Sequence, residues 1–416
     1  MGRVTEVAEQ LWTGVETTEK LNPLTTFLGL EQLADGVAFV CSLANVSALA
    51  TDDGLVLVDT GSHMSAESIR QMLRGWSDAP VHTAVYTHGH VDHVFGGPVL
   101  DREAGERGWA KPRVVAHEAL PARFDRYIAT AGYNGAINAR QFRMPGLTWP
   151  TDYRYPDVTY RDRLDLEVGG LTLELHHDKG ETDDHTWVWV PERGVLCTGD
   201  LFIWASPNCG NPQKVQRYPR EWARALDKMA ALGATVLLPG HGPPILGRDR
   251  VEQALRETAE LLHLVHDRTV ELMNQGLRLD EVMRRVELPS HLLERPYLRP
   301  VYDEPAFVIR NIWRLYGGWY DGNPARLKPA PDARVAVEVG RLCGGAVALA
   351  ARARAVADAG DLATACQLAE WAWQAAPGDT DARAARADIY ARRAESETSL
   401  MARSIYTAAA EESRDK

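Results

Sequence analysis

The sequence has 416 residues, of which 45% are hydrophobic and 25% charged, a composition typical of a globular protein with about two or three domains. The formal net charge of −11, without a run of Lys or Arg, argues against nucleic acid as a partner. The five scattered cysteines form no CxxC pair, which favours a reducing compartment over a disulfide framework. Residues 1–14 lack the apolar core of a signal peptide, and no run of about 18 apolar residues predicts a membrane span. We therefore expect a cytoplasmic protein.

The first predicted elements are strands and one helix. Residues 38–50 form a mostly apolar, β-prone run, and the Asp-Gly pair within residues 51–54 predicts a turn before a buried strand at 55–58. Asp59 ends that strand. Residues 65–76 have helical spacing with Ser65 as the expected N-cap, and residues 81–86 again favour a strand.

A cluster of histidines follows this last strand. His88, His90 and His93, with the carboxylate of Asp92, fall within six residues and are followed by Gly96 and Gly97. Neutral imidazole and carboxylate are the ligands of zinc-type metals. On a tight loop the first two histidines can point one way and Asp92 and His93 another, so the loop could serve two adjacent metals.

The middle of the chain supplies further polar candidates. His117 follows a predicted strand at 113–116 and is read as an orienting or structural histidine. Residues 120–142 are expected to be helical and then irregular, and Asn138 and Arg140 could reach a pocket from there unless they lie on a solvated loop. Residues 171–177 alternate like a strand and lead into an acidic turn in which Glu181 is the preferred metal ligand, with His177 and His185 as rivals.

Two more predicted strand ends carry side chains that could bind a metal. A strand pair at 187–190 and 194–197 ends in Gly199-Asp200. An amphipathic helix at 218–232 is followed by a strand and a glycine loop at 236–242, which holds His241.

The segment HGHVDH at 88–93 matches the HxHxDH signature of the metallo-β-lactamase superfamily, and the later GET, GD and PGHG segments occur in the same order as in that superfamily. The resemblance implies an α/β fold in which two sheets pack face to face between helices (αββα). It also implies that Asp59 orients a metal-binding histidine, although a simple strand-end cap is the alternative. Glu181 stands where most members have histidine, which is similar to the alkyl sulfatase branch, whereas Asp200 stands where that branch has Glu.

The same resemblance implies a ligand set for two zinc ions, with iron or manganese as other divalent possibilities. One ion would be held by His88, His90 and Glu181, the other by Asp92, His93 and His241, with Asp200 bridging the two. Asp92 and Asp200 would be the catalytic residues, and Asp92 could double as the proton acceptor.

The second half of the chain is predicted to be helical. Residues 251–275 form one long helical pattern, and 346–359, 362–376 and 380–394 form alanine-rich helices with the spacing of a tetratricopeptide-like hairpin. The GWYDGNP string at 318–324 resembles the dimerisation domain of alkyl sulfatases. We therefore predict a catalytic domain at 1–248, a helical dimerisation region at 249–416 and a homodimer.

The resemblance implies a binuclear hydrolase that splits an alkyl sulfate ester into alcohol and inorganic sulfate by metal-bound hydroxide. A cationic or amide side chain should complete the binding of the anionic substrate. The candidates are Arg217, Lys214, Arg140 and Asn138. A metallo-β-lactamase-fold hydrolase of another ester, lactone or thioester is the alternative, and a non-catalytic helical scaffold is a third hypothesis.

Overall fold

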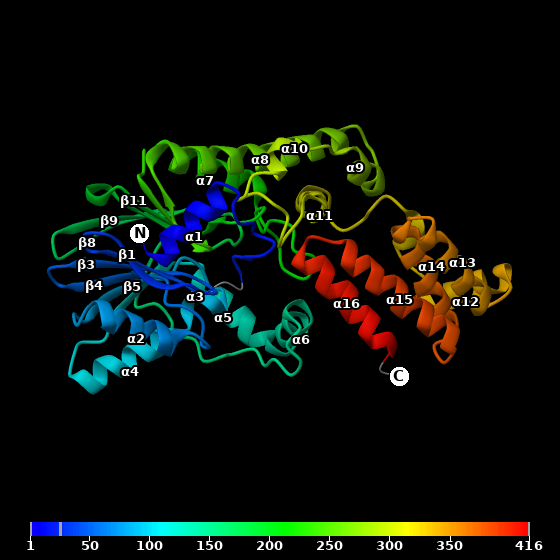
Figure 1. The fold of residues 1–416 in the computed structure, drawn as a ribbon, viewed down its shortest axis with the longest axis horizontal. Helices are drawn as coiled ribbons and strands as arrows, with labels where there is room; N and C mark the ends of the chain where they lie inside the picture. Colours follow the sequence, from blue (N-terminus) through cyan, green and yellow to red (C-terminus); the bar gives the residue numbers. More distant parts are fainter. Residues whose placement is uncertain (1, 25–26, 415–416) are drawn as a thin grey trace. The chain divides into compact units, whose positions relative to one another are not determined.

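The computed structural model describes residues 2–24 and 27–414. It divides the chain into two compact units, one formed by residues up to Ala131 together with Trp149–Gly318, and the other by Gly132–Thr148 together with the residues from Trp319 onward. The first unit contains both β-sheets, and the second is helical (Figure 1).

The first sheet has seven strands in chain order, antiparallel from β1 to β4 and parallel from β4 to β7. Its strands are β1 (Gly29–Ala34), β2 (Val37–Cys41), β3 (Val46–Thr51), β4 (Gly54–Val58), β5 (Val81–Val85), β6 (Arg113–His117) and β7 (Val158–Tyr160). The second sheet has the order β13-β12-β11-β10-β9-β8, and its strands are antiparallel except for β11 and β12. These strands are β8 (Arg163–Val168), β9 (Leu171–His177), β10 (Thr186–Val190), β11 (Val195–Ile203), β12 (Val236–His241) and β13 (Ile245–Leu246).

One hydrophobic core joins the facing surfaces of the two sheets. Phe39 and Val58 of the first sheet cluster with Leu173 and Val188 of the second, and all four are buried. Two further cores lie on the outer faces. The helices that cover these faces are α2 (Ala66–Trp76) and α4 (Gly97–Arg107) on the first sheet and α1 (Arg3–Trp12), α7 (Pro219–Ala230) and α8 (Arg248–Asn274) on the second.

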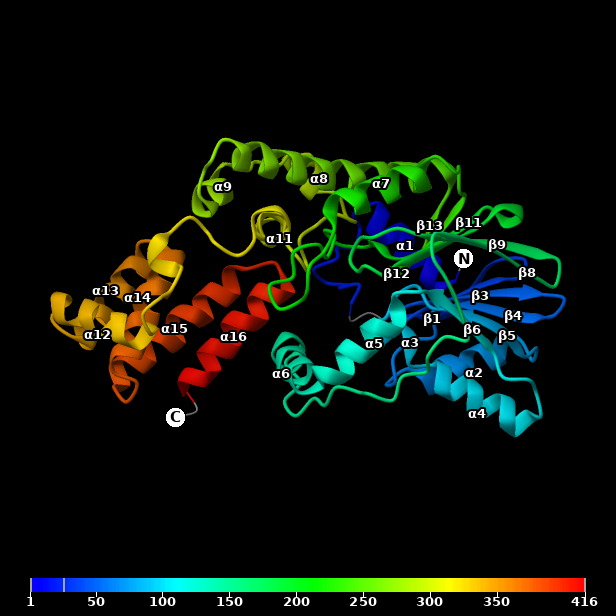
Figure 2. The ribbon, with the colours of Figure 1, turned by 180° about the vertical axis from the view of Figure 1, so that it is seen from behind.

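Figures 1 and 2 show these helices on opposite sides of the two sheets. The predicted αββα sandwich followed by a helical region is therefore confirmed.

The remaining helices of the first unit connect or follow the sheets. They are α3 (Val91–Val94), α5 (Leu120–Ala129), α9 (Leu279–Arg285), α10 (Ser290–Leu293) and α11 (Pro305–Gly317). Among the helices of the described residues, none is both long enough and apolar enough to cross a membrane.

The structure changes one local expectation and qualifies another. The β-prone run at 38–50 is two strands, because Asn45 turns the chain between them: its side chain accepts a hydrogen bond from Ser42 N and donates to Pro239 O at 2.9 Å and Gly242 O at 2.7 Å. Ser65 occupies the predicted N-cap position of α2, but its side chain makes no capping hydrogen bond, and its hydroxyl lies 2.9 Å from that of Ser62.

The second unit is built on small side chains. Its helices are α12 (Asp332–Cys343), α13 (Ala346–Asp358), α14 (Leu362–Ala375), α15 (Thr380–Ser396) and α16 (Leu400–Arg414), joined by the part of α6 (Ala131–Phe142) that follows Ala131. The buried residues Ala353, Ala369 and Ala385 let the helices approach closely. The alanine-rich helices α13 to α15 were predicted from the sequence, whereas α12 and α16 were not.

Candidate metal centre

The ends of strands from both sheets deliver the candidate ligands. His88 and His90 lie on the loop after β5, and Asp92 and His93 lie on the single turn of α3 that follows. Asp200 lies within β11, His241 is the last residue of β12, and Glu181 lies in the turn between β9 and β10. Packing the two sheets face to face therefore brings five chain segments to one place.

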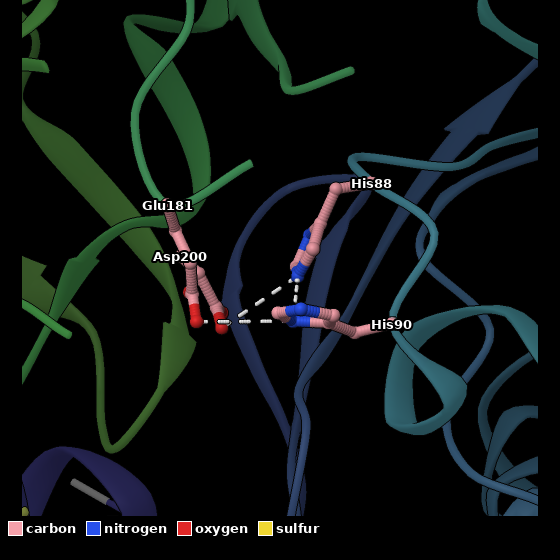
Figure 3. A group of neighbouring side chains, drawn as sticks. All are labelled: His88, His90, Glu181 and Asp200. Carbon is pink, nitrogen blue, oxygen red and sulfur yellow. Dashed lines mark hydrogen bonds and ion pairs between the residues drawn. The ribbon is translucent and has the colours of Figure 1, made fainter. Parts of the chain in front are cut away.

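The first group of ligands consists of His88, His90, Glu181 and Asp200, whose ligand atoms all lie within 4.8 Å of one another. His88 Nε2 is 2.8 Å from His90 Nδ1 and 3.7 Å from Asp200 Oδ2, and His90 Nδ1 is 3.8 Å from Glu181 Oε1. Figure 3 shows the two imidazoles facing the two carboxylates across a short gap.

The second group consists of Asp92, His93 and His241, again within 4.8 Å of one another. His93 Nε2 and His241 Nε2 lie 3.8 and 3.6 Å from Asp92 Oδ2. They also lie 3.3 Å from Asp200 Oδ1 and Oδ2, respectively. Asp200 thus contacts both groups, which is the position expected of a bridging carboxylate.

The chemistry of these atoms fits divalent metal ions. His93 Nε2 and Asp200 Oδ1, although 3.3 Å apart, make no well-aligned hydrogen bond, and the buried Glu181 Oε2 also has none, whereas buried polar atoms normally have one. Burial, together with the neighbouring His93 and His90, holds the pKa of His88 well below its usual value. A neutral imidazole is the form that binds a metal, so His88 is already in that form. Burial opposes the charged form of His93 and His241, but the Asp200 carboxylate outweighs it and raises the pKa of both, so these two rings would release a proton on binding a metal.

Outer contacts fix the orientation of the candidate ligands. Asp59, in the left-handed conformation with φ 63°, accepts hydrogen bonds from Thr87 N at 2.7 Å and Thr87 Oγ1 at 2.8 Å, and its Oδ2 lies 2.7 Å from His93 Nδ1. The predicted contact of Asp59 with a metal-site histidine is confirmed. Thr87 Oγ1 also lies 3.0 Å from His88 Nδ1, so the Asp59 carboxylate is tied to both groups of ligands.

The rival histidines play other roles in the structure. His185 Nε2 accepts a hydrogen bond from Asp200 N at 3.1 Å, and its ring stacks on His88 with centroids 4.9 Å apart. His177 Nδ1 pairs with His185 O, and the His177 ring stacks on His117 at 3.6 Å. Of the three acidic-turn candidates, the first ligand group contains Glu181 and neither His177 nor His185.

The predicted substrate-binding residues lie in different surroundings. Arg217 is buried and its Nη1 donates to Glu181 Oε1 at 2.5 Å. Lys214 places its ammonium 5.5 Å from the centre of the Trp149 ring. Asn138 and Arg140 lie on α6 in the second unit, whose placement relative to the first is not fixed.

Sequence reasoning missed two neighbours of the ligand loops. Arg123 on α5 pairs through Nε with Asp184 Oδ1 at 2.7 Å, and Asp184 Oδ2 accepts Gly89 N–H at 2.9 Å. Asn208 donates from Nδ2 to Glu181 Oε1. No local pattern marks these residues, because each acts on a segment at least 27 residues away in the chain.

Two family models and several known proteins match this chain. Residues 40–241 match the family model described as the metallo-beta-lactamase superfamily, and residues 278–416 match the model described as alkyl sulfatase dimerisation. The chain is 31% identical over 351 residues to a linear primary-alkylsulfatase from Pseudomonas sp., covering 78% of this chain and 63% of that protein. It is 29% identical over 401 residues to an (R)-specific secondary-alkylsulfatase from Pseudomonas sp., covering 89% and 60%.

A solved structure agrees with these matches. The stereoselective inverting sec-alkylsulfatase from Pseudomonas sp. superimposes with a TM-score of 0.83 at 27% identity, over 93% of this chain and 66% of that one. The chain thus spans about three fifths of the length of the curated relatives. The two sheets and the convergent donor set agree with both matching models: residues 40–241 belong to the metallo-β-lactamase superfamily, residues 278–416 form an alkyl sulfatase dimerisation domain, and the relatives that match over most of the chain are alkylsulfatases.

Proposed function

We propose that this chain is a binuclear metal-dependent hydrolase that cleaves alkyl sulfate esters to an alcohol and inorganic sulfate. The observation that carries the proposal is the pair of ligand groups joined at Asp200, with Glu181 as the only ligand from the turn after β9. The names of the relatives, a linear primary-alkylsulfatase and a secondary-alkylsulfatase, support the choice of a sulfate ester.

His88, His90 and Glu181 would hold one zinc ion and Asp92, His93 and His241 the other, with Asp200 between them. When bound, such a metal pair supplies a water of lowered pKa, about 7 for zinc, and offsets the negative charge of the ester. The protein residues then have to bind the ester, orient it and accept a proton.

Among the carboxylates of the site, Asp92 is the best placed to accept a proton. Its side chain keeps 25% of its surface exposed, against 5% for Asp200 and 1% for Glu181. A substrate or a water molecule can therefore reach Asp92 while the other two carboxylates stay shielded by the protein.

Lys214 is the proposed cationic contact for the sulfate group. Burial lowers the pKa of Lys214 to about 8, with Arg217 acting in the same direction and the carboxylates of Asp92 and Glu181 acting against it. Asp92 and Glu181 are candidate ligands, so their effect on Lys214 supports a place for its ammonium group near the site, where a cation can attract an anion. Asn138 and Arg140 stay predictions for substrate contacts, whereas the guanidinium group of Arg217 is hydrogen-bonded to Glu181 and Asn208.

The domain division follows from the same proposal. Residues 1–248 hold all the catalytic motifs and 249–416 would supply the dimerisation region, so we propose a homodimer, supported by the match of residues 278–416. All five cysteines are unpaired, which supports a reducing, cytoplasmic location.

The experiment has two stages. Metal analysis of the purified protein should find two divalent ions per chain, and sulfate release should be measured from primary and secondary alkyl sulfates of several lengths. A matched panel of carboxylate esters, lactones and thioesters tests the alternative hydrolase. Turnover of that panel without sulfate release from any alkyl sulfate would refute the proposed substrate class, and a protein unable to bind metal would refute the proposal as a whole.

A further inference from the structure

Two protein side chains donate hydrogen bonds to the carboxylate of Glu181. Arg217 Nη1 donates to its Oε1 at 2.5 Å, and Asn208 Nδ2 donates to the same oxygen. The other oxygen, Oε2, is buried and has no hydrogen-bond partner. Arg217 and Asn208 thus share Oε1, which is also the oxygen that lies 3.8 Å from His90 Nδ1, while Oε2 has no protein donor.

Arg217 is itself fixed by the scaffold. Its Nη1 also donates to Asn208 O at 2.7 Å, and its side chain is only 2% exposed. Its backbone N–H donates to Asn311 Oδ1 at 3.3 Å, and its carbonyl accepts Asn311 Nδ2–H at 3.0 Å. Asn311 of helix α11 therefore holds the backbone from which the Arg217 side chain extends.

The charge of the site explains why an arginine is needed there. Three carboxylates surround the site, those of Asp92, Glu181 and Asp200, and Glu181 is almost completely buried. A buried carboxylate is costly unless a paired and hydrogen-bonded cation accompanies it. A histidine at position 181 would be neutral and would need no such partner, so Arg217 offsets the charge that a glutamate introduces.

We propose that Arg217 is a positioning residue for Glu181, acting on metal affinity through that carboxylate and not through contact with the substrate. The inference rests on the proposed metal site but goes beyond the proposed reaction. Two measurements separate this role from that of a sulfate-binding arginine. Loss of a positioning residue changes metal affinity, whereas loss of a substrate contact changes KM.

The test compares Arg217→Met and Arg217→Lys with Arg314→Met in the full chain. Arg314 is a matched control, because it is an arginine of the same hydrogen-bond network that donates to Gln216 Oε1 at 2.9 Å and to Asn311 Oδ1 at 3.4 Å, and not to Glu181. Zinc affinity is measured by competition with a chromogenic chelator, and metal content by elemental analysis. Arg217→Met should weaken the binding of one of the two ions by about 10–100-fold, and Arg314→Met should leave both unchanged.

Arg217→Lys should restore part of the affinity, because an ammonium group keeps the charge but cannot reproduce the planar fork of donors. The lysine variant also keeps the test decisive if the methionine variant does not fold, as judged by circular dichroism. Unchanged affinity for both ions in Arg217→Met or Arg217→Lys, with or without a raised KM for the ester, would overturn the proposal.

A double-mutant cycle tests whether Arg217 acts through Glu181. In a Glu181→Gln background, which has already lost the carboxylate charge, Arg217→Met should cause little further loss of zinc affinity. Additive losses would show that Arg217 supports the site by another route and would overturn the proposal. The outcome is independent of sulfate release by the unmodified protein, so a failure here is distinguishable from a failure of the proposed function.

Discussion

Replacing Asp59 with asparagine removes one negative charge from behind the metal centre and changes little else. Asn has nearly the same shape as Asp, and it tolerates the left-handed backbone at φ 63° that most side chains avoid. The variant therefore separates the effect of the carboxylate charge from backbone strain. We expect Asp59→Asn to fold and to bind metal more weakly.

The size of the effect follows from the contacts of the carboxylate. Asp59 is 2% exposed, and its Oδ2 lies 2.7 Å from His93 Nδ1, so solvent does little to screen this contact. A hydrogen bond to a charged group contributes about 1.5–3 kcal/mol. Loss of an outer partner of a metal-binding histidine typically costs about 10–100-fold in metal affinity, which is roughly 1.4–2.8 kcal/mol at 1.4 kcal/mol per factor of ten.

The two estimates overlap, so we expect the ion held by His93 to bind about 10–100-fold more weakly in Asp59→Asn. The first ion should be affected less, because Asp59 reaches His88 only through Thr87 Oγ1. Chelator competition on the full chain measures both affinities. Asp53→Asn is the control, since it removes the same charge from an exposed turn where Asp53 accepts only Gly169 N–H at 3.0 Å. Unchanged affinity in Asp59→Asn, equal to that of the control, would refute the role assigned to this carboxylate.

Three further outcomes are expected. Removing metal with a chelator should lower the unfolding temperature, because ions present at about 1,000 times Kd stabilise the folded state by about 4 kcal/mol per site; an unchanged unfolding temperature would contradict this. Gly89→Ala should destabilise the protein by about 1–3 kcal/mol, since the new Cβ would lie 2.7 Å from Arg123 Cδ, whereas Gly75→Ala, with no atom within 4 Å, should not. At pH 8 a thiol reagent should modify the exposed Cys343 rapidly and the buried Cys197 only after unfolding. Burial raises the pKa of the Cys197 thiol to about 12, which keeps it protonated and unreactive. Rapid modification of Cys197 in the folded protein would contradict this.

The parts of the fold and site that could be predicted were those encoded by short segments. The HGHVDH string brings His88 and His90 together on the loop after β5 and Asp92 onto the helical turn that follows, and the end of β12 delivers His241. Asp200 was predicted at a strand end but lies inside β11, which continues to Ile203. Local periodicity also predicted the buried strands and α2. The structure brings the predicted ligand atoms together, and their binding of metal remains a prediction.

The parts that could not be predicted depend on contacts between distant segments. Asn45 lies inside an apolar, β-prone run, and its turn is stabilised by carbonyls 194 and 197 residues further along the chain. Arg123 has the spacing of a solvated helix residue, yet its side chain is 2% exposed and paired with Asp184. A single sequence gives the residue types but not which distant carboxylate or carbonyl will meet them.

The metal centre also depends on helices that follow the two sheets. Asn311 of α11 holds the backbone of Arg217, and Arg217 holds the carboxylate of Glu181. The proposed division at residue 248 marks where the catalytic motifs end, whereas the first packing unit continues to Gly318 and includes α8 and α11. Asn311 reaches the ligand loop through Arg217, whose buried ion pair ends at Glu181, so α11 contributes to the geometry of the site as well as to stability. A substitution of Asn311 can therefore change metal binding without touching a ligand.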